Sequence, residues 1–379
     1  MVIDPARPRL PSLAGSRGLA ALLVFAVHGW GTVWVAGMSL EAMGRGTRLA
    51  TPLVAFFFVL SGFVMVWSAR SGDTAGRFWR RRAAKILPNH VLLWALCLVL
   101  LVGSSATLIS TVPTLLLVQN WLPILEMNHG TSVVAWSLSV EAFCYLMFPL
   151  LLPLVRRLPA TALWPAVGVV FMAIVAVPTA ALFVTVGAPL PHLGITETQY
   201  WLVFLLPPVR MLEFILGMLL ALILLEGRRA PVGITTAGAL VVAGLVLGQL
   251  LPAVYAFAAV CSLPLGLFLL ALADADRAGT TSLLRTRAAV WLGDTSYAIY
   301  LSHILVITLV AGAIPAGTTR DFGSGIAVML VALVLCVAFS RLLFRAVEDP
   351  FSRRFGAAGL RRPAPPVAVP SPLGMQEPR

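Results

Sequence analysis

Charged side chains are scarce in this chain of 379 residues. Only 11% of the residues are Asp, Glu, Lys or Arg, and 59% are hydrophobic. A soluble protein carries about 25% charged residues. The composition therefore excludes an ordinary soluble domain as the main architecture and indicates an integral membrane protein.

Cysteine is also scarce. The four cysteines all lie inside apolar runs: Cys97, Cys144, Cys261 and Cys336. We interpret them as small buried hydrophobic residues, which excludes a disulfide framework and a zinc-ligand set. No bound metal is expected.

The apolar residues form ten runs, each near or above the ~20 residues that a membrane span needs. We therefore predict an all-α polytopic integral membrane protein with about ten transmembrane helices. The predicted spans are 18–36, 50–68, 86–104, 133–155, 160–187, 200–225, 231–249, 253–273, 289–314 and 322–347.

Acidic residues are outnumbered, with 15 Asp and Glu against 27 Lys and Arg. If the runs alternate across a membrane, most of the arginines fall on one side, which the positive-inside rule assigns to the cytoplasm. The basic surplus is then a topology signal rather than a nucleic-acid surface. Both termini are predicted to be cytoplasmic, with an N-terminal segment 1–17, a membrane domain 18–351 and a disordered tail 352–379.

The segment Ser104–Ser132 is the ambiguous part of this topology. It contains Pro113 and Pro123 among polar residues, although its middle is apolar. We expect an extracytoplasmic re-entrant or interfacial piece, since a further span would reverse the side of every later loop. The almost exclusive use of arginine over lysine, with Lys85 the single lysine, is typical of a GC-rich bacterial genome and predicts the bacterial plasma (inner) membrane.

Arg17 and His28 lie eleven residues apart in the first predicted span. Eleven residues are almost three helical turns, so both side chains share one face, separated by about 16 Å along the axis. Arg17 is then at the membrane surface and His28 is near the middle of the hydrocarbon core. An ionisable residue at that depth is costly to insert and is a functional-site hypothesis.

Polar residues in other spans fall in the same middle-to-outer band of depth when the helical rise is counted from the basic loops. They are Ser61, Glu141, Arg210, Glu213, Tyr300 and His303. Together with His28 they predict a polar chamber among the helices.

Structural explanations compete with this one. Arg210 and Glu213, at i and i+3, suit an ion pair within one helix. Ser61 beside Gly62 suits close helix packing. Tyr300 also suits a membrane-interface position, and His303 a simple hydrogen bond to a carbonyl group.

The basic run from Arg77 to Lys85 holds five cations in nine residues. A cytoplasmic loop that obeys the positive-inside rule would explain it. If the run is helical, Arg81, Arg82 and Lys85 fall on one face, and such a patch suits a polyphosphate ligand.

Several stretches, taken in order, resemble the membrane acyltransferase-3 family. They are Leu13-Ala-Gly-Ser-Arg17 with His28, Phe57-Phe-Val-Leu-Ser-Gly-Phe63, Arg80-Arg-Arg-Ala-Ala-Lys-Ile-Leu-Pro88, Trp136-Ser-Leu-Ser-Val-Glu141, Arg210-Met-Leu-Glu-Phe-Ile-Leu-Gly217, Ser296-Tyr-Ala-Ile-Tyr-Leu-Ser-His303 and Val347-Glu-Asp-Pro-Phe351. The chain departs from the family pattern at Lys85, where a second arginine is usual, and at Ala14, where an acidic residue is usual.

The resemblance implies an enzyme that moves an acyl group, usually acetyl, from cytoplasmic acyl-CoA to a hydroxyl of a carbohydrate or glycosylated small molecule. Acyl-CoA would be a co-substrate, with no permanently bound cofactor. Its phosphates would dock at Arg81, Arg82 and Lys85. Arg17 would lie nearer the membrane than this dock and is assigned to the catalytic residues with His28 and Glu141. His28 would be the general base, or else a transient acyl carrier, with Glu141 orienting it. The residues expected to bind substrate are Ser61, Trp136, Ser137, Arg210, Glu213, Tyr300 and His303.

Other functions remain open at this stage. A secondary transporter or flippase with a midplane site would also explain buried Arg, His and Glu residues. A non-catalytic scaffold or sensor would tolerate loss of His28 and Glu141. The other large class of membrane O-acyltransferases would carry a different Asn/His signature.

Overall fold

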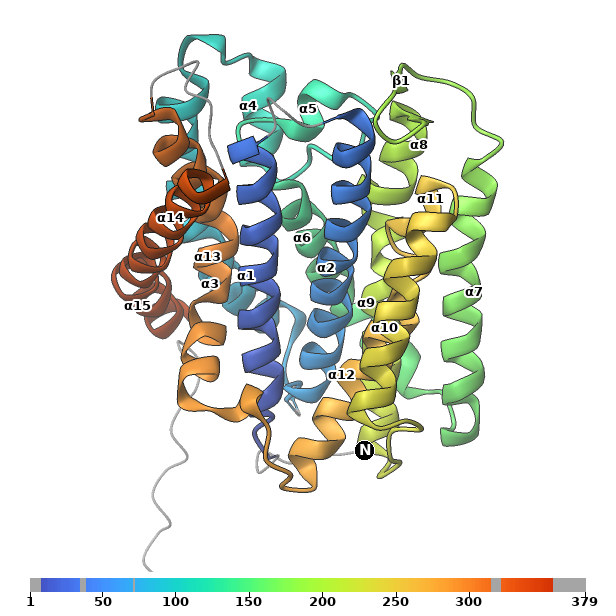
Figure 1. Ribbon diagram of the computed structural model, residues 1–379. Helices are drawn as coiled ribbons and strands as arrows, with labels where there is room; N and C mark the ends of the chain where they lie inside the picture. The colour runs from blue at the N-terminus through green and yellow to red at the C-terminus, as the bar shows by residue number, and fades with distance from the viewer. Residues whose placement is uncertain (1–7, 35–38, 71, 315–321, 357–379) are drawn as a thin grey trace, which may run out of the picture.

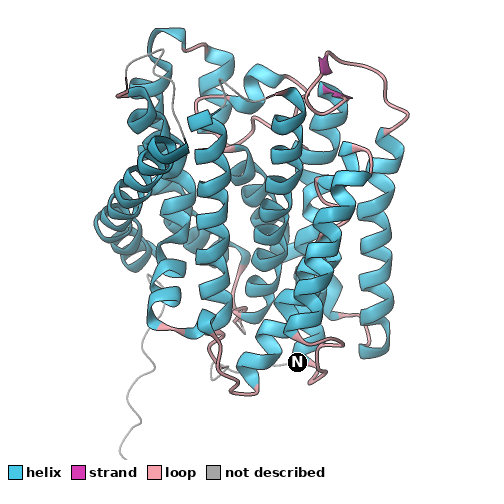
Figure 2. Cartoon of the chain, viewed as in Figure 1, coloured by secondary structure: helices cyan, strands magenta, loops and turns pink. Residues whose placement is uncertain are grey.

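The computed structural model describes residues 8–34, 39–70, 72–314 and 322–356, and it is a bundle of long helices that run side by side (Figure 1). Most of the described chain is helical, and loops connect the helices (Figure 2). The described strands are β1 (Pro189–Leu190) and β2 (Ile195–Thr196), which pair antiparallel. The all-α prediction is confirmed.

Eight helical stretches of the described chain are long and apolar enough to cross a membrane. Their main helices are α1 (Pro11–Trp34), α2 (Leu40–Trp67), α3 (Ala75–Cys97), α6 (Trp136–Arg156), α7 (Leu163–Ala181), α9 (Pro207–Leu225), α13 (Arg287–Gly312) and α14 (Phe322–Leu343). Two shorter helices pack against α2, namely α10 (Ile234–Leu250) and α12 (Ser262–Arg277). Each of the ten predicted runs therefore corresponds to a helix of the bundle.

Short helical pieces extend or connect these helices. They are η2 (Leu98–Val102), η3 (Gly103–Ser105), α4 (Leu108–Leu115), α5 (Leu125–His129), η4 (Ala160–Ala162), α8 (Glu197–Tyr200), η5 (Trp201–Leu205), α11 (Ala253–Ala256), η6 (Leu283–Arg285), η7 (Phe344–Glu348), α15 (Asp349–Phe351) and η8 (Ser352–Gly356). In the ambiguous segment 104–132, α4 and α5 pack together at the end of the bundle opposite the N-terminus (Figure 1). With 8 and 5 residues, neither is long enough to cross a membrane, as expected.

Three helices begin earlier than the apolar runs predicted. Helix α1 starts at Pro11 instead of residue 18, α2 at Leu40 instead of 50, and α3 at Ala75 instead of 86. Polar N-caps explain two of these starts, since the hydroxyl groups of Ser39 and Thr74 each accept a backbone hydrogen bond from the first turn. Part of the predicted N-terminal segment 1–17 is thus helical. Of the predicted tail 352–379, residues 357–379 lie outside the described chain.

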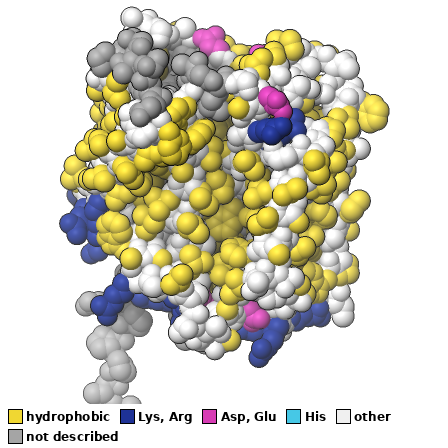
Figure 3. Space-filling model, viewed as in Figure 1, with side chains coloured by type: hydrophobic (Ala, Val, Ile, Leu, Met, Phe, Trp, Pro, Cys, Tyr) yellow, Lys and Arg dark blue, Asp and Glu magenta, His cyan; other side chains and the backbone are white. Residues whose placement is uncertain are grey.

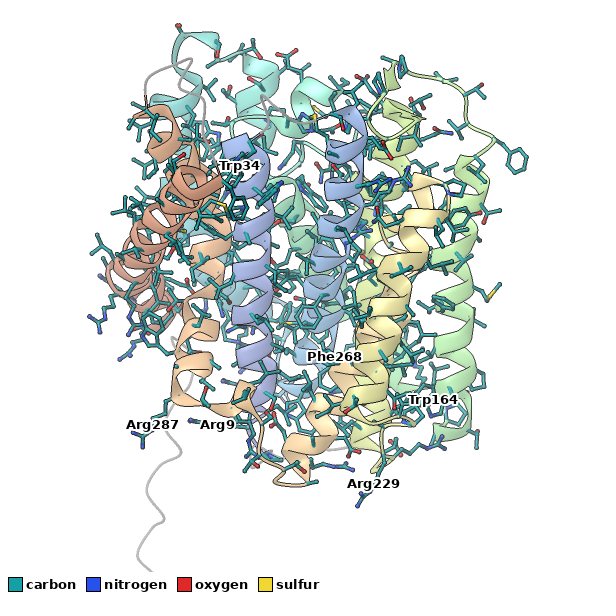
Figure 4. The ribbon with its side chains drawn as sticks, viewed as in Figure 1. Arg9, Trp34, Trp164, Arg229, Phe268 and Arg287 are labelled. Atoms are coloured by element: carbon teal, nitrogen blue, oxygen red, sulfur yellow. The ribbon has the colours of Figure 1, made fainter. Side chains whose placement is uncertain are left out.

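Basic side chains gather at one end of the bundle. Arg9, Arg229 and Arg287 lie at the end that holds the N-terminus, whereas Trp34 lies toward the other end (Figure 4). On the face shown in Figure 3, a broad hydrophobic band lies above a basic lower edge. This distribution agrees with the predicted one-sided arrangement of the arginines.

Two pairs of helices make the most extensive contacts, α1 with α13 and α2 with α9, and both approach through glycine. A Cβ atom added at Gly293 would lie 2.0 Å from the carbonyl oxygen of Ala14, and one at Gly18 would lie 2.8 Å from the nitrogen of Gly293. Gly62 of α2 and Gly217 of α9 likewise leave room for the backbone of the other helix, because a Cβ atom at either position would collide with it. Small residues allow the backbones to approach closely enough for dispersion contacts to hold membrane helices together.

The α1–α13 contact gives a stability prediction. We expect Gly293→Ala to destabilise the protein by about 1–3 kcal/mol, because the new methyl group meets backbone atoms that cannot move aside. Gly312→Ala, in the same helix, is the matched control, since a Cβ atom there has nothing within 4 Å. Thermal unfolding in detergent, followed by tryptophan fluorescence, should show a lower Tm for Gly293→Ala alone. Equal Tm values for both variants would contradict the close-contact interpretation.

Candidate active site

A cavity of about 150 Å³ lies between α1, α2, α3, α6 and α13. It brings together seven of the residues predicted from the sequence: Arg17, Ser61, Arg82, Lys85, Ser137, Glu141 and Tyr300. Of the residues that the depth argument placed in one chamber, Ser61, Glu141 and Tyr300 line this cavity, whereas His28, Arg210, Glu213 and His303 do not.

Hydroxyl groups organise the inner wall of this cavity. The Tyr145 hydroxyl donates to the Glu141 carboxylate, and Ser61 Oγ lies 3.0 Å from the Tyr145 hydroxyl and 3.4 Å from Glu141 Oε1. Elsewhere in the lining, Ser137 Oγ and the Tyr300 hydroxyl are 2.7 Å apart. Glu141 is therefore held by α2 and its own helix.

Three cations, Arg17, Arg82 and Lys85, and two carboxylates, Glu141 and Asp294, line the cavity. Arg17 Nε and Nη2 donate to the carbonyl oxygen of Gly293 at 3.0 and 2.6 Å, which fixes the guanidinium against α13. Its charge also interacts with the carboxylates of Asp294 and Glu348. Lys85 is attracted to Glu348 and repelled by Arg17. The carboxylates offset part of the positive charge that would otherwise be concentrated here.

His28 pairs with His303 across the α1–α13 contact. His303 Nδ1 lies 2.6 Å from the Tyr300 carbonyl oxygen, and His303 Nε2 lies 3.1 Å from His28 Nδ1. A carbonyl oxygen only accepts, so His303 carries its hydrogen on Nδ1. When the His303 ring is neutral, its Nε2 has no hydrogen and is an acceptor. His28 Nδ1, also 3.1 Å from the Val24 carbonyl oxygen, is then the donor. His28 Nε2 keeps its lone pair and has no hydrogen-bond partner among the described residues.

Neither histidine lines the cavity. Tyr300 connects the two features, because it lines the cavity and its ring lies 5.8 Å from that of His303. The predicted contact in which Glu141 orients His28 is not made among the described residues. His303 occupies that position instead, because the close α1–α13 packing brings it against the His28 ring.

Arg210 and Glu213 lie outside the cavity, in the α7–α9–α12 region. Their side chains are fully buried, with Arg210 Nη2 3.0 Å from Glu213 Oε2. Ser262 donates to Glu213 at 2.9 Å, and the Arg210 guanidinium lies over the rings of Phe58 and Phe204. The structure thus has the ion pair within one helix that the spacing suggested. Substrate binding by this pair stays a prediction.

Trp136 and Arg81 also lie outside the cavity. The Trp136 ring is buried against Phe204, with ring centres 4.3 Å apart. Arg81 forms a bidentate pair with Asp73 at the N-terminal end of α3. This hydrogen bond lowers the pKa of Asp73, which keeps the carboxylate ionised and the pair intact at neutral pH.

Four residues near the cavity were not assigned from the sequence: Asn89, Tyr145, Asp294 and Glu348. Asn89 Nδ2 donates to Glu348 Oε2 at 3.1 Å, which ties the C-terminal segment to α3. Asn89 lies in the predicted span 86–104 and Glu348 follows the span 322–347, so the sequence places both near the same end of the bundle but does not predict their contact. Within the described chain, no group of three His, Cys, Asp or Glu residues could hold a metal ion.

Residues 10–343 match the acyltransferase-3 family, which is described as an acyltransferase domain. The chain belongs to this family. It is similar to acyltransferase MdmB of Streptomyces mycarofaciens, with 36% identity over all of this chain and 99% of the relative. It is also 27% identical to the exopolysaccharide production protein ExoZ of Rhizobium meliloti (strain 1021), over 83% of this chain and 93% of the relative. No solved structure matches. The protein is thus a membrane-embedded O-acyltransferase.

The buried ion pair of Arg210 and Glu213 gives a prediction that distinguishes a structural role of the pair from a role in substrate binding. We expect Arg210→Met to destabilise the protein by about 3–5 kcal/mol, because Glu213 is left buried without its counterion. The double variant Arg210→Met/Glu213→Leu should recover most of this loss. Thermal unfolding of the purified variants measures both. An Arg210→Met protein with the wild-type Tm but without acyl transfer would instead support substrate binding.

Proposed function

We propose that this enzyme transfers an acyl group, with acetyl the expected group, from cytoplasmic acyl-CoA to a hydroxyl of a carbohydrate or glycosylated small molecule. We place it in the bacterial inner membrane. The observation that carries the proposal is the His28–His303 pair beside a cation-lined cavity. It leaves His28 Nε2 unpartnered and able to accept a proton.

His28 acts as the general base in this mechanism. Its Nε2 takes the proton of the acceptor hydroxyl while the oxygen attacks the carbonyl carbon of the thioester. The carbon–sulfur bond then breaks, and the proton passes to the departing CoA thiolate. An imidazole is suited to both transfers, because its ordinary pKa of about 6.5 lies near neutral pH.

His303 positions His28 for this step. By accepting from His28 Nδ1, it fixes the tautomer that leaves Nε2 unprotonated, as a second hydrogen-bonding group does for many catalytic histidines. The Tyr300 carbonyl in turn fixes His303. We propose that Glu141, held by Tyr145 and Ser61, acts on substrate in the cavity rather than on His28.

The cations Arg17, Arg82 and Lys85 suit an anionic donor that enters from the basic end of the bundle. A carbohydrate acceptor is supported by the printed name of ExoZ, which concerns exopolysaccharide production. Because Tyr300 lies between the cavity and His303, the acceptor hydroxyl has to reach His28 past the Tyr300 ring or from the opposite end of the bundle.

Acyl transfer can be measured as release of free CoA from acetyl-CoA by protein in proteoliposomes, with candidate sugars added. We expect acceptor-dependent release by the wild type and a loss of about 10²–10⁴-fold in His28→Ala, the usual contribution of a positioned base. His303→Ala should lower kcat less, with an unchanged KM for acetyl-CoA, because it alters only how His28 is held.

His192→Ala is the matched control, since this histidine lies in the β1–β2 connection, away from the cavity, and should leave turnover unchanged. Normal turnover by His28→Ala would refute the assignment of the base. No release by a folded wild type with any acyl-CoA would favour a transporter or flippase.

A further inference from the structure

The active-site cavity extends along α2, which forms one of its walls. Six of the α2 residues that line it share one helical face: Val54, Phe57, Phe58, Ser61, Val64 and Met65. Val54 and Met65 are eleven residues apart, which is a rise of about 16 Å. Met65 marks the basic end of the cavity, because it also lines a second cavity with Arg70, Arg156 and Arg157. Val54 therefore marks the inner end.

Charged side chains line the cavity from its basic end to its middle. Arg82, like Met65, borders both cavities. Asp294 lies near the start of α13, at the same end of the bundle, and interacts with Arg17. The Glu141 carboxylate is farther in, with Oε1 3.4 Å from Ser61 Oγ in the middle of the α2 wall.

Apolar side chains form the inner end of the cavity. They are Val54, Phe57, Phe58 and Leu138. Val54 lies farthest in, about two turns of α2 beyond Ser61. The Phe57 ring is 5.7 Å from the ring of Tyr300, whose hydroxyl group pairs with Ser137. A chain that enters from the basic end therefore passes charged groups, then hydroxyl groups, and ends against hydrocarbon.

The volume and the lining indicate what the inner end can hold. A cavity needs about 10–15 Å³ for each water-sized group, so the volume of about 150 Å³ holds roughly ten to fifteen such groups along a length of about 16 Å. These proportions suit a linear chain rather than a sugar ring. A sugar would also bury hydroxyl groups against apolar side chains without partners, which is costly. The inner end therefore suits the hydrocarbon part of an acyl group.

We propose that the apolar inner end is the acyl-chain pocket and that Val54, as its floor, selects the length of the acyl group. This proposal rests on the acyl-CoA-dependent function proposed above. The thioester carbonyl lies beside the hydroxyl groups of Ser137 and Tyr300, and its carbon chain points toward Val54. A short unbranched chain fits this space, whereas a longer chain meets the Val54 side chain.

Selectivity among acyl-CoA donors tests the floor of the pocket. In the wild type we expect kcat/KM, measured as acceptor-dependent CoA release, to fall from acetyl-CoA to hexanoyl-CoA, by about 10–200-fold for a methylene group that no longer fits. Val54→Ala should raise the ratio of hexanoyl to acetyl transfer by about tenfold or more, and Val54→Leu should lower the ratio of butyryl to acetyl transfer. Each ratio compares two donors on one preparation, so it does not depend on how much of a variant is folded.

Val59→Ala is the matched control. Val59 is fully buried in the same helix but does not line the cavity, so the same truncation there should leave the wild-type ratios unchanged. Binding of the thioethers S-ethyl-CoA and S-hexyl-CoA to the purified protein in nanodiscs gives a second readout, because a thioether cannot transfer its chain. We expect the wild type to bind S-ethyl-CoA more tightly than S-hexyl-CoA, and Val54→Ala to reduce this difference.

The outcomes separate the pocket from the proposed function. Equal selectivity in the wild type and both Val54 variants would overturn the pocket, and so would the same shift in Val59→Ala. A wild type that binds both thioethers equally well would overturn it as well. Binding that depends on chain length and on Val54, without acyl transfer from any donor, would refute the proposed function and leave the pocket in place.

Discussion

The close approach of α1 and α13 is the constraint on which the rest of the site depends. Glycines at the crossing let the two backbones touch, and this contact brings Arg17 onto the Gly293 carbonyl and His28 against His303. The two histidines are 275 residues apart, so no local preference could pair them. In a membrane, where burial of apolar surface does not drive helices together, such packing is what places polar groups at a defined depth.

Because charged residues are scarce in this chain, each buried ionic group is expected to have a structural or functional role. Arg210 and Glu213 neutralise each other deep in the bundle and make no contact with the cavity. Glu348, in the C-terminal segment, is held by Asn89 and offsets the charge of Lys85. Since an unpaired ion is costly in hydrocarbon, the proposed function explains why cations are kept around the cavity, where an anionic donor would neutralise them.

Helical periodicity and charge distribution were enough to predict the helices, and depth along them placed Ser61, Glu141 and Tyr300 at the level of one cavity. They could not predict which helices touch. Glu141 and His28 have similar depths, which suggested a contact, but depth along the axis says nothing of the direction in which a side chain points around it. Helix ends were predicted poorly for a related reason. The capping hydroxyl of Thr74, rather than hydropathy, sets where α3 begins.

Tyr300 links the cavity to the pair of histidines. Its hydroxyl is held by Ser137 and its carbonyl holds His303, so one residue forms both the wall of the cavity and the support of the proposed base. In the proposed mechanism the thioester lies in the cavity, which neither histidine lines. Water that enters with the donor therefore does not meet the base and the thioester together, which limits wasteful hydrolysis. Transfer then requires an acceptor whose own binding brings its hydroxyl to His28, so the acceptor, rather than the donor, controls when the reaction begins.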